Sequence, residues 1–281
     1  MARIALIPES ELGLLKGLLL RRASGRLAME SEHVVSWRLK QLAWRRNLLG
    51  TEELFDLLRE GQDPALEEEV VEQLLDTETW FFRDETLFRG IHEVILPDLH
   101  RIRNGSVFVK FWSPGSGSGQ EIYSLILTVR HHFPAMKDWD LRVLGTDVLE
   151  SRLEKARLGA YTEQEVRRGL PISLLARYFH RRDGLWTVNE DIRTQASFRQ
   201  SDITEGLGPR VPSFDLVCVR NLLAGIEPGL RAKAMDSAAR QVSPGGYLVL
   251  GEGEAGLGVE PDLRVFRKLG GGLFKSFAQE W

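Results

Sequence analysis

The feature that most constrains the fold is a glycine-rich segment between a predicted strand and a predicted helix. Residues 107–111 are mainly β-branched and aromatic, residues 115–119 contain three glycines, and apolar residues recur at helical spacing over 122–129. Glycine permits positive φ and lets the backbone approach a ligand closely. The helix would direct its free N–H groups at the loop. Because glycine clusters also mark ordinary turns, a nucleotide-like cofactor site and a plain turn are both open interpretations.

Two further predicted strands end in polar residues. Residues 141–147 end in Asp147, and the near-continuous apolar run 214–219 leads into Arg220 and Asn221. An apolar run of this kind is typical of a strand buried on both faces of a parallel sheet. The carboxyl ends of such strands are where open α/β sheets bind ligands. Asp147 would accept hydrogen bonds from a ribose diol, or it would cap a helix that begins near Glu150. The glycine spacing is not the dinucleotide fingerprint, so a nicotinamide cofactor is not indicated.

The segments around these strands differ in pattern. Residues 1–76 show helical periodicity without a strand pattern, which predicts a small all-helical domain. Residues 77–281 would form the α/β domain. Within it, residues 159–200 break the strand–helix alternation, with short strands expected at 186–188 and 196–198. We expect this insertion to be a small antiparallel β-subdomain.

Composition limits the classes of function. The net charge of −3 gives no overall basic field for nucleic acid. The single cysteine, Cys218, excludes an intramolecular disulfide and a cysteine-built metal site, and no metal is expected. The apolar run near residues 12–20 is broken by Lys16 and is too short to span a bilayer. We therefore expect a soluble cytoplasmic monomer that does not bind nucleic acid and does not insert into a membrane.

Charge is uneven in the predicted helical domain. Residues 1–50 carry nine Lys or Arg against four Asp or Glu, whereas residues 51–76 carry one against ten. Arg38, Lys40, Arg45 and Arg46 cluster on or near the second predicted helix. This cluster is either a solvated face or a docking surface for an acidic partner, since clustered charge steers association.

Three consecutive aromatic residues follow the helical domain. Trp80, Phe81 and Phe82 lie between Thr79 and Arg83. The aromatic residues are expected to fill a core at the domain junction. Thr79 and Arg83 are four positions apart, so we expect them to meet on one helical face.

These motifs, taken in order, resemble a known family. The run from Thr79 to Asp84, the loop from Gly115 to Glu121, Thr146-Asp147, the strand ending in Arg220-Asn221 and the turn Pro244-Gly245-Gly246 are similar to the CheR family of chemotaxis receptor methyltransferases. The resemblance covers nearly the whole chain. It implies an α/β fold class, with a small N-terminal helical bundle and a Rossmann-like S-adenosylmethionine-dependent methyltransferase domain carrying an inserted β-subdomain.

The resemblance also implies a reaction and a site. The family transfers a methyl group from S-adenosyl-L-methionine to glutamate side chains on a chemoreceptor's cytoplasmic domain and releases S-adenosyl-L-homocysteine, tuning signalling in a chemotaxis-like pathway. Arg83 and Arg220 would serve the reaction, since either would orient the substrate carboxylate. The cofactor would be held by the residues that match the family's motifs: Thr77, Thr79, Arg83, Glu121, Asp147, Asp202, Ile203, Arg220 and Asn221.

Some residues depart from the family pattern. Gly225 stands where the family has a tyrosine thought to lie beside the transferring methyl group, Asp202 replaces the usual asparagine, and Gln120 replaces the first of two glutamates. Two alternatives to the glutamate methyltransferase therefore stay open. One is a non-catalytic or weakly active relative that binds S-adenosylmethionine and acts through protein contacts. The other is a methyltransferase for a small molecule.

Overall fold

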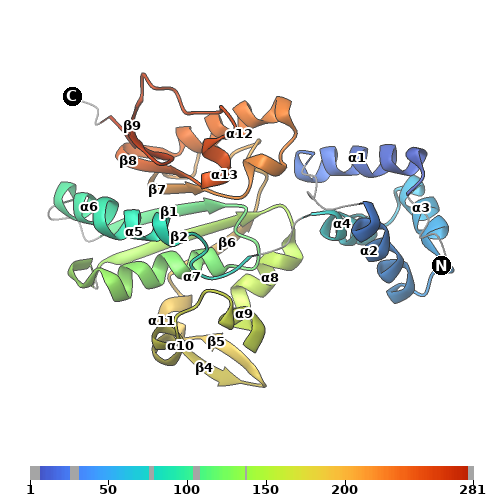
Figure 1. Cartoon of the computed structure of the whole chain (residues 1–281), viewed down its shortest axis with the longest axis horizontal. Coiled ribbons are helices and arrows are strands. Elements are labelled where there is room, and N and C mark those ends of the chain that lie inside the picture. The colour runs from blue at the N-terminus through green and yellow to red at the C-terminus, as the bar shows by residue number, and fades with distance from the viewer. Residues whose placement is uncertain (1–6, 26–31, 76–78, 104–107, 137, 278–281) are drawn as a thin grey trace. The chain divides into compact units, whose positions relative to one another are not determined.

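The structure is a computed structural model that describes residues 7–25, 32–75, 79–103, 108–136 and 138–277. The chain forms two compact units. The first contains Met1–Thr77 and Gly225–Leu230, and the second contains Glu78–Ala224 and Arg231–Trp281. Each unit has its own set of buried apolar residues and is described by itself below (Figure 1).

The first unit is a bundle of helices. Leu15, Leu39 and Leu54 from three of these helices are all buried, as is Val70 from the fourth. The fourth helix begins at Pro64, and the Asp63 carboxylate caps it by accepting a 2.9 Å hydrogen bond from the Leu66 N–H. The predicted helical bundle is thus confirmed, with helices α1 (Glu9–Ala23), α2 (Glu32–Arg45), α3 (Thr51–Glu60) and α4 (Pro64–Leu74).

The second unit is built on a seven-stranded, mostly parallel sheet. The strands lie in the order β6-β2-β1-β7-β8-β10-β9. Strands β6, β2, β1, β7 and β8 are mutually parallel, and β10 is antiparallel to both of its neighbours. The strands are β1 (Phe108–Pro114), β2 (Asp140–Asp147), β6 (Ala196–Gln200), β7 (Phe214–Val219), β8 (Val242–Leu250), β9 (Phe266–Gly270) and β10 (Leu273–Ser276). This arrangement confirms the predicted α/β, Rossmann-like fold.

Helices connect and flank these strands (Figure 1). They are α5 (Glu85–Gly90), η1 (Ile91–Ile95), α6 (Leu96–Ile102), α7 (Gln120–Leu127), η2 (Thr128–His132), η3 (Pro134–Met136), α8 (Glu150–Leu158), η4 (Leu223–Gly225), α12 (Pro228–Arg240) and α13 (Glu252–Ala255). Among the described residues, none of the helices combines the length and apolar character needed to cross a membrane.

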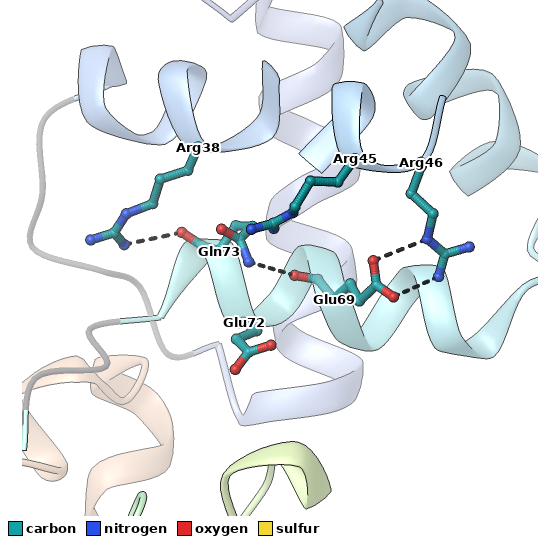
Figure 2. A pocket seen from close by; sticks show the side chains of 6 residues that line it. All are labelled: Arg38, Arg45, Arg46, Glu69, Glu72 and Gln73. Atoms are coloured by element: carbon teal, nitrogen blue, oxygen red, sulfur yellow. Dashed lines mark hydrogen bonds and ion pairs between the residues drawn. The ribbon is translucent and has the colours of Figure 1, made fainter. Parts of the chain in front are cut away.

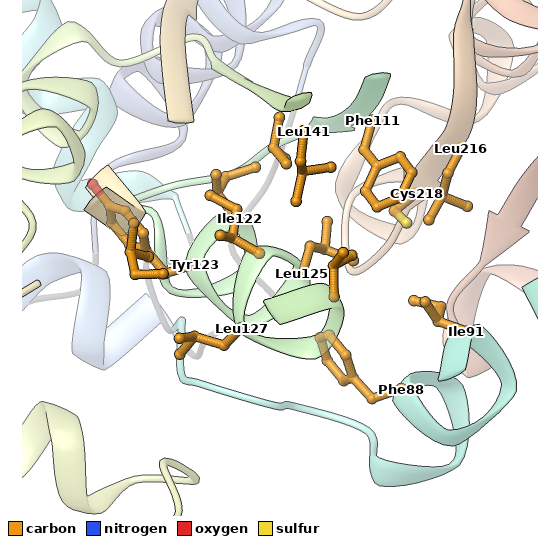
Figure 3. Packing of buried hydrophobic residues seen from close by; sticks show 14 of the residues in the cluster. Phe88, Ile91, Phe111, Ile122, Tyr123, Leu125, Leu127, Leu141, Leu216 and Cys218 are labelled. Carbon is orange, nitrogen blue, oxygen red and sulfur yellow. The ribbon is translucent and has the colours of Figure 1, made fainter. Parts of the chain in front are cut away.

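The core of the second unit forms around α7, as Figure 3 shows. Ile122 and Leu125 of this helix share one apolar cluster with Phe111 of β1, Leu141 of β2 and Leu216 of β7. All five are at most 1% exposed. Full burial of such side chains contributes roughly 1.5–3 kcal/mol each, so this packing fixes α7, and the loop before it, against the sheet.

The strand order reverses between β1 and β7. From β1 the chain moves outward through β2 to β6, and it then returns to β7 and β8 on the other side. In sheets of this kind, ligands bind at the carboxyl ends of the strands beside the reversal. Glu121, Asp147 and Arg220 all follow or end strands at this edge.

The insertion after α8 is an antiparallel three-stranded sheet in the order β3-β5-β4. It contains β3 (Ala160–Tyr161), α9 (Glu163–Arg167), α10 (Ile172–Tyr178), β4 (Phe179–Arg182), β5 (Leu185–Val188) and α11 (Glu190–Arg193). The predicted strand at 196–198 is present, but its placement in the insertion was wrong. These residues belong to β6, which pairs in parallel with β2 at the edge of the main sheet. The insertion therefore lies within the crossover from β2 to β6. Strand β6 is a half-exposed edge strand, so it lacks the long apolar run that would have identified it as part of the main sheet.

Candidate functional site

The glycine loop closes tightly over the start of α7. Gly115, Gly117 and Gly119 have φ values of 71°, 53° and 91°, a region that side chains other than glycine rarely adopt. A Cβ atom at Gly117 would lie 2.8 Å from the Thr79 methyl group, and one at Gly119 would lie 2.9 Å from the Ala156 Cβ atom. The three glycines are therefore needed both for conformation and for space.

A buried ion pair lies directly beside this loop. Arg220 follows β7, is 4% exposed, and donates from Nη1 to the Glu121 Oε2 atom at 2.6 Å. The other carboxylate oxygen of Glu121 accepts a 2.6 Å hydrogen bond from the Ser113 hydroxyl. Arg220 Nη2 donates to the Arg83 carbonyl oxygen and lies 3.7 Å from the Asp84 carboxylate. Strand β7, helix α7 and the segment before α5 thus converge on one guanidinium group.

Arg83 is held by an aromatic stack. Its guanidinium lies 4.0 Å from the Trp80 ring centroid, and the guanidinium of Arg168, from the inserted subdomain, lies 4.1 Å from the same ring. Phe81 is fully buried and packs edge-on against Tyr161 and Phe179 of the insertion, which confirms its predicted core role. The backbone of Gly169 approaches so closely that a Cβ there would lie 2.0 Å from the Phe81 carbonyl oxygen.

The expectation that Thr79 and Arg83 share a helical face is wrong. Helix α5 begins only at Glu85, and the preceding segment contains two non-glycine residues with positive φ, Phe82 at 48° and Asp84 at 77°. Such conformations cost energy and persist where surrounding contacts enforce them. Here the Ser124 hydroxyl accepts from the Phe82 N–H at 3.0 Å, and the Asp84 carboxylate caps α5 by accepting from the Leu87 N–H.

Thr79 contacts the glycine loop. Its hydroxyl donates to the Gln120 side-chain oxygen at 2.8 Å and lies 3.0 Å from the Ser118 hydroxyl. Gln120 is 1% exposed, so the residue that replaces a family glutamate acts here as a neutral acceptor in the loop. Thr77, the other threonine predicted to hold the cofactor, lies outside the described residues.

Asp147 is buried at the end of β2. Its carboxylate accepts hydrogen bonds from the N–H groups of Gly117 at 3.0 Å and Leu149 at 3.1 Å, and it lies 3.9 Å from Arg152. The alternative that Asp147 caps the next helix is wrong, because the N-cap of α8 is Leu149, without a side-chain hydrogen bond. A carboxylate offers about four acceptor positions, so two backbone bonds leave capacity for further donors.

The remaining predicted residues lie at the ends of neighbouring strands. The Ser201 N–H donates to the Asp147 carbonyl oxygen at 2.9 Å, which places Asp202 and Ile203 beside the end of β2. Asp202 accepts from the Thr204 N–H at 2.8 Å, and Ile203 is buried. Asn221 is exposed directly after Arg220, with a φ of 50°.

Hydrogen bonds thus join Thr79 to the loop, and join Arg220 to Glu121 and to the Arg83 carbonyl oxygen. Sequence reasoning missed several partners of these residues. Ser113 holds Glu121, Arg152 approaches Asp147, Arg168 stacks on Trp80, and Glu254 accepts from the Leu222 N–H at 2.8 Å. Ser113 and Arg152 lie close in sequence to the end of β1 and to Asp147, which is a signal that could have identified them. The other two become neighbours only through the fold.

Three residues of the basic cluster, Arg38, Arg45 and Arg46, line a separate pocket of about 690 Å³ between α2 and α4, shown in Figure 2. Arg46 binds Glu69 at 2.8 Å and Asp63 at 2.9 Å, and these hydrogen bonds, with Glu69 contributing most, raise the Arg46 pKa. Arg38 donates to the Gln73 carbonyl oxygen at 3.2 Å, whereas Arg45 and Lys40 are exposed. The predicted cluster therefore divides into residues that tie the bundle together and residues that face solvent.

The parallel sheet, the glycine loop after its first strand and the charged pair at the strand ends define a Rossmann-like domain with a cofactor cradle. Residues 77–268 match the family model described as CheR methyltransferase, SAM binding domain. Because this match covers more than half of the chain, the chain belongs to the CheR methyltransferase family. Its cofactor is S-adenosyl-L-methionine, as predicted.

Curated relatives agree with this family. Chemotaxis protein methyltransferase 2 of Vibrio cholerae serotype O1 is 32% identical over 188 residues, which cover 66% of this chain and 65% of that protein. A chemotaxis protein methyltransferase of Vibrio anguillarum is 28% identical over 256 residues, which cover 89% of this chain and 90% of that protein. Chemotaxis protein methyltransferase 1 of Pseudomonas aeruginosa is 30% identical over 82% of this chain and 84% of its own length. The match thus spans slightly less than two thirds of the first relative and most of the other two.

Proposed function

We propose that this chain methylates glutamate side chains on the cytoplasmic domain of a chemoreceptor, and so tunes signalling in a chemotaxis-like pathway. It would act in the cytoplasm as a monomer. The observation that carries the proposal is the placement of Arg83 and Arg220 in one contact network at the cofactor edge of the sheet. The Arg83 guanidinium suits a carboxylate acceptor, because it forms charge-assisted hydrogen bonds with it, while Arg220 beside it holds the cofactor.

The side chains around this network favour an acceptor that needs no deprotonation. Arg83, Asp84, Glu121 and Arg220 meet there. Of the histidines in the second unit, His92, His100, His131 and His132 contact one another, Phe133, Trp139 or Tyr178, and His180 contacts Asn189. A carboxylate is already ionised and nucleophilic at neutral pH, so a site without a histidine base suits it.

The residues present fit the cofactor. Arg220 Nε and Ser116 Oγ are buried without a hydrogen-bond partner among the described residues, and buried polar groups of this kind call for a ligand or water. The methionine part of S-adenosylmethionine carries an ammonium and a carboxylate, which match Glu121 and Arg220 respectively. We assign the ribose hydroxyls to Asp147, beside the glycine loop, and the adenine side to Asp202 and Ile203. Thr79 and Asn221 complete the assignment, together with Thr77, which lies outside the described residues.

The chain's own residues would then act by alignment. S-adenosylmethionine supplies an electrophilic methyl group on its sulfonium centre. Arg83 orients the acceptor carboxylate toward that group, while Trp80 and Arg168 hold the Arg83 guanidinium in place. The buried Arg220–Glu121 pair fixes the amino acid end of the cofactor. Holding two reactants in a productive geometry can supply several kcal/mol of the barrier reduction without a protonation step.

One experiment tests the proposal. Isothermal titration with S-adenosylmethionine is followed by a methyl-transfer assay on the cognate receptor's cytoplasmic fragment, with mass spectrometry to locate glutamate methyl esters. Binding followed by ester formation is the expected result. Transfer to free small acids but not to the fragment would favour the small-molecule methyltransferase. An absence of binding would contradict the assignment of the cofactor residues.

A second candidate function rests on Gly225. This residue ends η4 where the family has a tyrosine, and the chain there places buried Ile226 next. A chain without the tyrosine hydroxyl would bind the cofactor and act through protein contacts with little turnover. Binding without ester formation would favour this candidate. Restoration of turnover by Gly225→Tyr would then identify the missing hydroxyl as the cause.

A further inference from the structure

A second cavity lies in the methyltransferase unit, at the carboxyl end of β8. It has a volume of about 410 Å³, near the lower end of the roughly 300–1,000 Å³ common for ligand pockets. Its wall is mainly aliphatic: Ile91 and Ile95 come from η1, Val249 and Leu250 from β8, and Leu273 from β10. The two isoleucines and the two β8 residues are at most 2% exposed and form the rigid base of the cavity, whereas half-buried Leu87 and Leu273 supply accessible apolar surface.

The cavity adjoins the candidate site through a shared residue. Asp84 lines the cavity, and its carboxylate lies 3.7 Å from Arg220 of the charged network. Asp84 also fixes the start of α5 by accepting from the Leu87 N–H at 3.1 Å. Strand β8 is the parallel neighbour of β7, which leads into Arg220, so the cavity opens at the same edge of the sheet as the proposed chemistry.

We infer that this cavity receives an aliphatic side chain of the protein substrate, one that neighbours the methyl-accepting carboxylate. The inference rests on the proposed function. The aliphatic wall recognises an apolar group, and the Asp84 carboxylate at its edge disfavours a second anion in the cavity. The cavity would thus select among carboxylates by what lies beside them in the substrate.

The wall chemistry favours a tethered side chain over a free small ligand. Pockets for free ligands place several polar groups to fix orientation. Here the polar side chains of the wall are Asp84 and Thr86, and Asp84 is already engaged by Leu87 N–H and Arg220. A substrate side chain needs no such anchors, because its backbone and the neighbouring carboxylate are held elsewhere.

Gly90 provides a sharp test. It lines the cavity, has helical backbone angles, and a Cβ atom there would meet no heavy atom within 4 Å. The Cβ position is therefore open, and we expect Gly90→Leu to direct its side chain into the cavity. The matched control is Gly13→Leu on α1, where a Cβ atom also meets nothing within 4 Å and which lines neither of the two cavities described above. Gly90→Ala supplies a smaller filling group.

The wild-type chain must first methylate the receptor fragment. Failure of this reaction would contradict the proposed function and, with it, the inference about the cavity. Given that activity, Gly90→Leu should lower kcat/KM for the fragment by at least about tenfold. Gly90→Ala should have a smaller effect, and Gly13→Leu none. Affinity for S-adenosylmethionine should match the wild type in all three variants, and the thermal midpoint should be at least as high, because a helical glycine is replaced in each; this excludes misfolding.

A coupled substitution identifies the occupant. Alanine replacements of aliphatic residues near the methylated glutamate should lower wild-type kcat/KM, and one of them should have no further effect on Gly90→Leu. Full activity of Gly90→Leu would overturn the inference. Strict additivity of every substrate replacement with Gly90→Leu would also overturn it, and would favour a free apolar ligand as the occupant.

Discussion

Arg220 is the residue on which the candidate site depends most. Its guanidinium is almost fully buried, and it is compensated by Glu121, by Asp84 and by the Arg83 carbonyl oxygen. A buried cation that loses one of its partners becomes strongly destabilising, because the remaining charge is left without compensation. Arg220 therefore couples the start of α7 to the segment before α5. A change at either end should affect both binding and folding.

Arg83 and Arg168 allow a matched comparison. Both guanidinium groups stack on Trp80, at 4.0 and 4.1 Å, so each alanine variant should lose a similar amount of stability, about 0.5–1 kcal/mol. Arg83→Ala should also lose a charge-assisted contact to the acceptor carboxylate, which lowers turnover by about tenfold or more. Arg168→Ala should retain much more activity. Steady-state methylation and urea unfolding measure the two effects, and equal activity losses would show that Arg83 is structural.

Asp147 and Asp202 can be compared in the same way. Asp147→Asn should weaken S-adenosylmethionine binding by about 1.5–3 kcal/mol if the carboxylate holds the ribose hydroxyls. Asn keeps one oxygen acceptor, so one of the two backbone bonds, from Gly117 or Leu149, is lost, and thermal unfolding of the variant measures that separate structural cost. Asp202→Asn, which restores the usual family residue, should bind at least as tightly as the wild type. Titration calorimetry measures both affinities; an unchanged value for Asp147→Asn would remove the ribose assignment.

At the scale of elements, the methyltransferase unit is joined by polar contacts between segments far apart in the chain. Asp98 of α6 accepts a 2.7 Å hydrogen bond from the Tyr247 hydroxyl of β8 and another from Lys275 of β10. Helix α6 is thus tied to the antiparallel edge of the sheet as well as to the core through Leu96 and Leu99. The contribution of these hydrogen bonds to the free energy of unfolding should depend on pH.

Burial raises the pKa of Asp98, but hydrogen bonds from Lys275, Tyr247 and Arg101 outweigh it and lower the pKa from 3.8 to about 2. A lowered native pKa contributes stability that is fully present above the unfolded value near 3.8 and is lost as the pH falls toward 2. Asp98→Asn should therefore cost about 2 kcal/mol at pH 7 and progressively less below pH 4. Urea unfolding followed by circular dichroism measures this difference.

Asp56→Asn is the control for the Asp98 variant. The Asp56 side chain is 71% exposed and pairs with Arg59 one helical turn away, and such surface pairs contribute little to stability. Its effect should be small at every pH. A constant difference between the wild type and Asp98→Asn from pH 7 to pH 2 would contradict the assigned pKa shift.

The elements that the sequence predicted well are those with strong local signals. Strand β7 was predicted from its near-continuous apolar run, β1 from its β-branched and aromatic residues, and the loop before α7 from its glycines, which its conformation requires. The same reasoning missed the parallel pairing of β6 and the non-helical path from Thr79 to Asp84. Both depend on contacts with distant segments, which local periodicity does not report.

At the scale of the whole molecule, the two units differ in how their charges are used. In the methyltransferase unit, the key arginine is buried and paired, whereas α2 of the helical unit exposes Lys40 and Arg45 together with Trp37 and Trp44, which are 61% and 75% exposed. Exposed aromatic and basic residues in proximity are typical of interaction surfaces. The sequence identified this basic cluster but did not distinguish Arg46 from its exposed members. Arg46 pairs with Glu69 in α4 and with Asp63 at the N-cap of α4, and so connects the end of α2 to α4.

That distinction determines how docking to an acidic receptor should be tested. Lys40→Glu with Arg45→Glu reverses two exposed charges without breaking the Arg46 contacts to Glu69 and Asp63. If this face steers the receptor, association should slow by about tenfold at low ionic strength, and the difference should shrink as salt screens the charges. Lys233→Glu with Arg240→Glu on α12 changes net charge by the same amount on another helix and should slow association much less. Stopped-flow association with the receptor fragment measures both pairs. Equal slowing would show that net charge alone matters, and unchanged rates for Lys40 and Arg45 would leave a solvated face.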